Sequence, residues 1–143
     1  MTSPDGSTYI GQMKHGKREG KGKMTARDGT KYKGEFRNDH FDGNGILVMP
    51  HRGTYAGEFK TGKLDGYGTF QMLNGITMKG KFRSNQLDGL CTLVLPNGSV
   101  IEGEYKNGVA DGNWSIKDLS GVKREWKMQD GILNSVKEAL QGI

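Results

Sequence analysis

The sequence predicts an all-β protein, an elongated single-layer antiparallel sheet built as a β-hairpin repeat solenoid. Glycine supplies 24 of the 143 residues, more than twice its ordinary share. Apolar and polar residues alternate with period two, which is typical of strands with one covered face. Three glycine series also share a spacing of 23 residues, and only Arg52 breaks step: Gly11, Gly34, Gly57, Gly80, Gly103; Gly20, Gly43, Gly66, Gly89, Gly112; and Gly6, Gly29, Gly75, Gly98, Gly121.

Each unit contains two predicted strands. The first is represented by Tyr32-Lys33-Gly34-Glu35-Phe36 and the second by Gly43-Asn44-Gly45-Ile46-Leu47. Both place aromatic or apolar residues and glycine on one face, and the first places charged residues on the other. A helix would scatter these glycines around its circumference, at a cost of about 1 kcal/mol each. Five full units and a sixth partial unit therefore predict eleven strands.

The connections between strands carry turn residues. Asp28-Gly29 and Asn74-Gly75 are typical of tight hairpin connections, since glycine adopts positive φ without a Cβ penalty. The other connection is expected to have left-handed backbone at five equivalent positions, Gly16, Asp39, Gly62, Asn85 and Gly108. Eleven strands spaced about 4.8 Å apart would give a meander roughly 50 Å long and about 20 Å wide.

A single sheet with only 33% hydrophobic residues needs a special source of stability. Glycine weakens a strand unless something covers it, and an aromatic side chain lying flat across it can do so. We therefore expect aromatic rings to cover the strand glycines. Each unit would contact only its neighbours, so stability would accumulate repeat by repeat.

The combination of Tyr-x-Gly-Glu-Phe, a short turn and Asp-Gly-x-Gly resembles the MORN (membrane occupation and recognition nexus) repeat. The best copies are 32–36 with 42–45 and 55–59 with 65–68, and the resemblance covers about residues 6–131. Later units depart from the pattern: Met78 and Ile101 replace the leading tyrosine, and Cys91 and Trp114 replace the second glycine. The resemblance implies a twisted or curved antiparallel sheet and a non-catalytic role in scaffolding, in cytoskeletal or ciliary assembly, or at membranes.

The two ends differ from the central units. We assign residues 1–131 to the repeat array and 132–143 to a short helix with a capping box at Ser135–Glu138. That helix would either cap the last hairpin or dock on a partner. Pro4-Asp5-Gly6 has the residues of a hairpin turn but lacks most of a preceding strand. Either the first strand is an exposed edge, which allows self-association, or the chain begins inside a longer protein.

Catalysis, cofactors and metals are not expected. The chain has one cysteine, Cys91, which rules out an intrachain disulfide and favours a reducing, cytoplasmic location. No apolar run is long enough to span a membrane, and no signal peptide is recognisable. His15, His40 and His51 occupy different repeat positions, so neither a zinc site nor a catalytic base is indicated. Residues 11–17 and 57–63 match GxxxxGK, but neither match continues into Ser or Thr, as a nucleotide site requires.

Two surfaces are candidates for binding. An aromatic face could accept a peptide or helix of a protein partner, unless its rings serve only to cover glycine: Tyr9, Tyr32, Tyr55, Phe36, Phe59, Phe82 and Tyr105. A basic row could bind acidic phospholipids or an acidic protein tail: Lys14, Arg37, Lys60, Arg83 and Lys106. An acidic row follows five residues behind it: Glu19, Asp42, Asp65, Asp88 and Asp111. The alternative for both rows is cross-strand ion pairing together with carboxylate bonds to turn N–H groups.

These features predict a non-enzymatic scaffold or adaptor that binds a protein partner, associated with the cytoskeleton or a cilium. A peripheral membrane module for acidic phospholipids is the alternative, and the repeat portion of a larger enzyme is a third interpretation. The interleaved acidic row disfavours nucleic acid as a partner.

Overall fold

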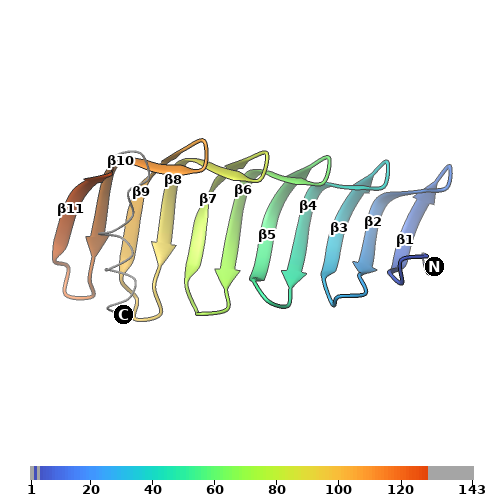
Figure 1. The fold of residues 1–143 in the computed structure, drawn as a ribbon, viewed down its shortest axis with the longest axis horizontal. Helices are drawn as coiled ribbons and strands as arrows, with labels where there is room; N and C mark the ends of the chain where they lie inside the picture. Colours follow the sequence, from blue (N-terminus) through green and yellow to red (C-terminus); the bar gives the residue numbers. More distant parts are fainter. Residues whose placement is uncertain (1, 3, 129–143) are drawn as a thin grey trace.

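The computed structural model describes residues 2 and 4–128, and they form a single antiparallel sheet (Figure 1). The predicted helix at 132–143 and the end of the array lie outside the described residues. Strand order follows chain order, which confirms the predicted meander of eleven strands. The strands are β1 (Thr8–Lys14), β2 (Lys17–Thr25), β3 (Lys31–Arg37), β4 (His40–Met49), β5 (Gly53–Lys60), β6 (Lys63–Met72), β7 (Thr77–Arg83), β8 (Gln86–Val94), β9 (Val100–Lys106), β10 (Val109–Lys117) and β11 (Lys123–Met128).

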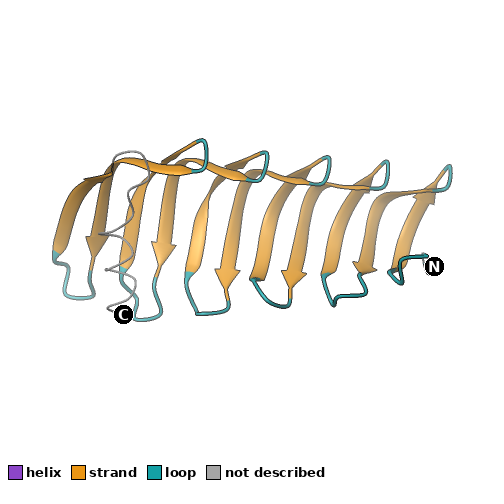
Figure 2. Ribbon diagram, in the orientation of Figure 1, coloured by secondary structure: helices purple, strands orange, loops and turns teal. Residues whose placement is uncertain are grey.

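The sheet is one layer deep and its connections lie along two opposite edges (Figure 2). Two-residue turns, beginning with His15 and Gly16, form the upper edge in Figure 1, and longer loops such as 26–30 form the lower edge. The strands bend near the upper edge, so the sheet is not flat. One of its faces, which we call the inner face, carries the buried tyrosine and phenylalanine side chains, and the other is the outer face.

A β-bulge inside each of the five hairpins from β1–β2 to β9–β10 accompanies this bend. Between β3 and β4, Gly34 pairs with Gly45 and Phe36 pairs with Phe41, so Glu35 alone faces residues 42–44. Gly43 within the bulge has φ 94°, a conformation that favours glycine. Bulges of this kind bend a strand and increase its twist. The pairing between successive hairpins, for example β2 with β3, has no such shift.

The upper-edge turns confirm the predicted left-handed backbone. Gly16, Asp39, Gly62, Asn85 and Gly108 have φ between 69° and 80°. The residue before each of them is also left-handed, with φ of 49° at Thr61 and 48° at Ser84. Two consecutive left-handed residues are the feature of a type I′ turn, whose twist matches that of the flanking strands.

The tyrosine rings cover the strand glycines as expected. A Cβ atom added at Gly45 would lie 2.3 Å from the Tyr32 hydroxyl oxygen, and one added at Gly68 would lie 2.2 Å from that of Tyr55. Each hydroxyl also donates a hydrogen bond to a carbonyl oxygen three residues on, from Tyr32 to Glu35 at 2.7 Å and from Tyr55 to Glu58 at 3.1 Å. The ring therefore covers bare backbone and satisfies a carbonyl at the bulge.

The later repeats keep the contact but exchange its parts. Where Met78 replaces tyrosine, Cys91 replaces the facing glycine, is buried, and occupies space that a ring fills elsewhere. In the next hairpin Ile101 replaces tyrosine, and the ring comes from the other strand: a Cβ at Gly103 would lie 2.0 Å from the Trp114 indole. The indole Nε1 donates to the Asp111 carbonyl at 3.1 Å, the role of the tyrosine hydroxyl.

Candidate partner-binding surfaces

Six of the seven aromatic residues predicted to bind a partner are buried in the sheet's own core. Tyr32 is 1% exposed and Tyr55 is fully buried, and the rings pack edge to face along the array. Phe59 illustrates this, with ring centroids 5.3 Å from Tyr32 and 5.2 Å from Tyr55. Tyr105 is half-buried in a second cluster around Trp114. The other buried rings of this set are Tyr9, Phe36 and Phe82. Because the six rings have so little exposed area, a partner would meet the side chains around them.

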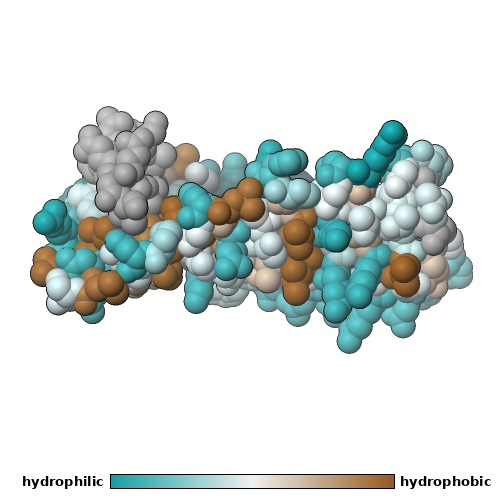
Figure 3. All heavy atoms as spheres, turned by 90° about the horizontal axis from the view of Figure 1, so that it is seen from below, coloured by the Kyte–Doolittle hydropathy of each residue, from teal (hydrophilic) through white to brown (hydrophobic). Residues whose placement is uncertain are grey.

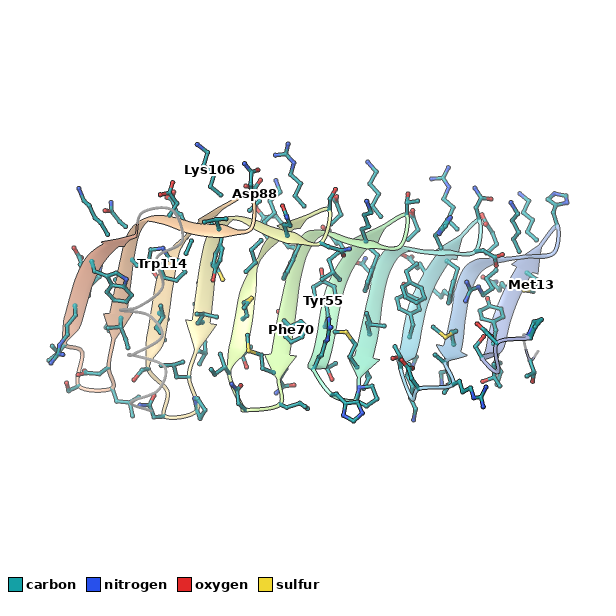
Figure 4. All side chains as sticks on the ribbon, in the orientation of Figure 1. Met13, Tyr55, Phe70, Asp88, Lys106 and Trp114 are labelled. Atoms are coloured by element: carbon teal, nitrogen blue, oxygen red, sulfur yellow. The ribbon has the colours of Figure 1, made fainter. Side chains whose placement is uncertain are left out.

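Half-buried apolar side chains next to this core form the part of the inner face that a partner can touch. We call them the inner apolar stripe: Met24, Phe41, Leu47, Leu64, Phe70, Met78 and Leu87. Phe41 stacks on Tyr32, with centroids 3.8 Å apart and ring planes 6° from parallel. At the first repeats, Met24 and Phe41 line a hollow of about 450 Å³ together with Arg18. Figure 4 shows Phe70 close to Tyr55 on the ribbon.

The sequence does not reveal this stripe because its residue types vary from repeat to repeat. The position of Phe41 is occupied by Arg18, Leu64, Leu87 and Ala110 in the other units. Alternation assigns these residues to the inner face, but it does not show which side chains on that face stay accessible. Figure 3 shows apolar residues exposed as separate patches along the molecule, between polar ones.

The acidic row mainly binds backbone of the next upper-edge turn. Carboxylate oxygens of Glu19 and Asp42 accept N–H groups of Asn38 at 2.9 Å and Thr61 at 3.1 Å. The turn in return donates to the preceding hairpin, as in the bond from the Gly62 N–H to the Phe41 carbonyl at 2.8 Å. These bonds hold successive turns together and explain why acidic residues recur at this position.

The predicted ion pairing between the two rows occurs at one of the five described positions. Arg83 Nη1 lies 3.3 Å from Asp88 Oδ2. The other basic side chains are exposed and form no ion pair within the described part of the chain: Lys14, Arg37, Lys60 and Lys106. For the first three, the carboxylate that each would meet accepts a turn N–H group instead. In Figure 4, Lys106 projects from the upper edge beside Asp88.

Comparison with known families agrees with this geometry. The MORN repeat model matches five segments, residues 9–31, 32–50, 55–77, 79–100 and 102–113, which together cover more than half of the chain. The chain belongs to the MORN repeat family. No curated protein matches it. MORN repeats are a non-catalytic repeat type that generally mediates protein or membrane interactions.

Burial in the MORN core raises the pKa of four phenols, those of Tyr9, Tyr32, Tyr55 and Tyr105, and of the Cys91 thiol. It raises the pKa of Tyr32 and of Tyr55 to about 12, and the pKa of Cys91 to about 11, since the charged forms lose hydration. A thiol of this kind is a poor nucleophile at neutral pH. Within residues 2 and 4–128, no three His, Cys, Asp or Glu side chains could together hold a metal ion.

The MORN sheet also has an edge strand at β1. Thr2 forms an isolated bridge with Thr8, and the described residues contribute no further strand on that side. Met13 occupies the position of Phe36 and Phe59 in later repeats, and its side chain is 42% exposed. Self-association through this edge stays a prediction. Residues 2 and 4–128 contain no helix with the length and apolar character needed to cross a bilayer.

Proposed function

We propose that this MORN array is a non-enzymatic scaffold or adaptor that holds a peptide or helix of a protein partner on the inner apolar stripe. The supporting observation is a set of half-buried apolar side chains on a rigid aromatic base. Such a base needs little reordering when a partner binds, which lowers the entropic cost of association. Apolar surface rimmed by charge is typical of protein interfaces. Assembly at the cytoskeleton or in a cilium is the cellular setting that we propose.

A pair of leucine variants tests this proposal. Leu64 lies on the inner apolar stripe and Leu90 is 64% exposed on the outer face. Proteins captured from cells by the unmodified chain would be identified, and the direct partner purified. We expect Leu64→Gln to weaken binding of that purified partner about tenfold or more, and Leu90→Gln to leave it unchanged. Far-UV circular dichroism must show that both variants fold. Equal binding by the folded variants would contradict the proposal.

Recognition of acidic phospholipids is the second candidate, supported by the exposed basic row at the upper edge. The adjacent acidic row opposes it, because negative charge beside the basic row offsets the attraction to an anionic membrane. Flotation with phosphatidylserine vesicles separates the two functions. Membrane binding would require the chain to float at low salt, to be released at high salt, and to lose binding in Lys60→Glu/Lys106→Glu.

A further inference from the structure

Four lysines gather on the outer face of β2 and β3, namely Lys21, Lys23, Lys31 and Lys33. Lys23 and Lys33 are directly opposite each other in the antiparallel pair. Like charges in that arrangement destabilise a sheet. Among the described residues, none of the four lysines is in an ion pair. Glu35, which pairs with Lys21 in register, directs its carboxylate to the N–H of Asn44 at 2.7 Å.

The repeat architecture does not require this cluster. The equivalent positions 23 residues later hold Asn44, Ile46, Thr54 and Ala56. None of these is charged, although the backbone pairing there is the same. The pair of opposed lysines, Lys23 and Lys33, is therefore a local departure from the period, and it adds repulsion without contributing to the core.

The same part of the outer face forms a groove, which we call the lysine groove. Its floor is the bare backbone of Gly11, Gly22 and Gly34, and its volume is about 610 Å³. Lys23, Lys33 and Ile10 line one side, and Lys21, Glu35 and Asn44 line the other. Ile10 is 76% exposed. The backbone N–H and C=O groups are used within the sheet, so the floor presents mainly apolar Cα atoms.

We propose that the lysine groove binds an extended acidic peptide segment of a protein partner. Apolar side chains of the segment would lie on the glycine floor and against Ile10, and its carboxylates would meet the lysines on both sides. The lining residues stand two positions apart along each strand, about 7 Å, so the groove admits one extended chain. A flat membrane surface could reach Ile10 and the lysine ends but could not enter the recess. This site is on the opposite face from the inner apolar stripe and does not depend on it.

Fluorescence anisotropy with a defined peptide tests the proposal. The probe is a fluorescein-labelled ten-residue peptide of alternating glutamate and valine, and the comparison peptide alternates lysine and valine. The variant is Lys23→Glu/Lys33→Glu, which keeps one like-charge pair across the strands and is therefore expected to fold as well as the unmodified chain. The matched control is Lys79→Glu/Lys81→Glu, which reverses two exposed lysines on the same face of β7, outside the groove.

We expect the acidic peptide to bind, the basic peptide not to bind, and the Lys23→Glu/Lys33→Glu variant to weaken binding about tenfold or more. The control should stay within about twofold. Equal losses in the two variants would mean general charge attraction and overturn the proposal, as would failure of the acidic peptide to bind. The proposal is also overturned if phosphatidylserine vesicles, and not the peptide, bind in a way that depends on Lys23 and Lys33. The Leu64→Gln variant should bind the peptide normally, so the inner-face proposal can fail separately.

Discussion

Grafting the Met78–Cys91 pair onto the positions of Tyr55 and Gly68 tests whether a ring and its glycine form one packing unit. In the single variant Gly68→Cys, the new Cβ would lie 2.2 Å from the Tyr55 hydroxyl oxygen and 2.4 Å from its Cζ. The Tyr55 ring is fully buried and held by edge-on contacts with Phe59 and Phe82, so it has little room to move. Overpacking of this kind costs about 1–3 kcal/mol.

The other single variant, Tyr55→Met, loses different interactions. It removes the hydrogen bond to the Glu58 carbonyl, a contribution of about 1 kcal/mol. It also removes two edge-on ring contacts, about 0.5–1.5 kcal/mol each, so the free energy of unfolding should fall by about 2–4 kcal/mol. In the double variant the cysteine side chain occupies space left by the ring, as Cys91 does beside Met78. The two losses should therefore not add, and we expect a coupling of about 1–3 kcal/mol in favour of the double variant.

Urea denaturation followed by far-UV circular dichroism measures the three free energies. The matched control combines Tyr55→Met with Gly22→Cys, because Gly22 lies under the Tyr9 ring in a different hairpin. That pair should be additive within about 0.5 kcal/mol. If the Tyr55 and Gly68 variants prove as additive as the control, rings and glycines contribute independently, and the contact between them is not what stabilises the single-layer sheet.

Three further predictions concern charges and buried groups. Asp42→Ala should lower the free energy of unfolding by about 1 kcal/mol because the Thr61 N–H loses its acceptor, whereas Arg37→Ala should have almost no effect; urea denaturation distinguishes them. The pKa values of Tyr32 and Tyr55 are raised to about 12, so the folded chain keeps phenol protons that the unfolded chain releases near pH 10. The free energy of unfolding should therefore be full below pH 10 and fall as pH rises toward 12. Tyr32→Phe/Tyr55→Phe should reduce that fall, as measured by thermal melts between pH 8 and 12. Cys91 is buried with a pKa raised to about 11, so a thiol reagent should label it slowly in the native protein and at once in guanidinium, and rapid native labelling would show that the core around it opens.

Much of the fold could be predicted because each residue type has a distinct backbone or packing consequence. The 23-residue period and the alternation predict the strands, and Gly, Asp and Asn at Gly16, Asp39 and Asn85 indicate left-handed turns. The first turn residue escapes prediction at Thr61 and Ser84, because threonine and serine have no strong preference for positive φ. The bulges could not be predicted, because a period-two pattern does not show where three residues of one strand face a single residue of the neighbouring strand.

The candidate site could be predicted less well, because alternation assigns a side chain to a face but does not give its depth. The tyrosines lie on the predicted face, yet their rings turn down onto glycine and leave the surface to neighbours such as Leu47 and Phe70. The spacing also predicts more ion pairs between the basic and acidic rows than the structure shows, for a related reason. Spacing places Asp42 near Arg37, but the turn N–H of Thr61, which belongs to the next repeat, is the partner that the carboxylate reaches.

Recurrence separates structural residues from candidate binding residues in this array. A side chain that recurs every 23 residues has the same neighbours in each unit. Glu19, Asp42 and Asp65 are therefore explained by their bonds to the turns, and the tyrosines by the glycines beneath them. Residues that depart from the period fall into two kinds. Cys91 and Trp114 depart together with a compensating change nearby, and the core stays filled. Lys23 and Lys33 depart with no compensating acid among the described residues, and they add repulsion to an otherwise regular sheet. At an uncompensated departure of the second kind, a binding partner is expected to supply the missing opposite charge. For that reason the lysine groove gives the more specific test of the two surfaces.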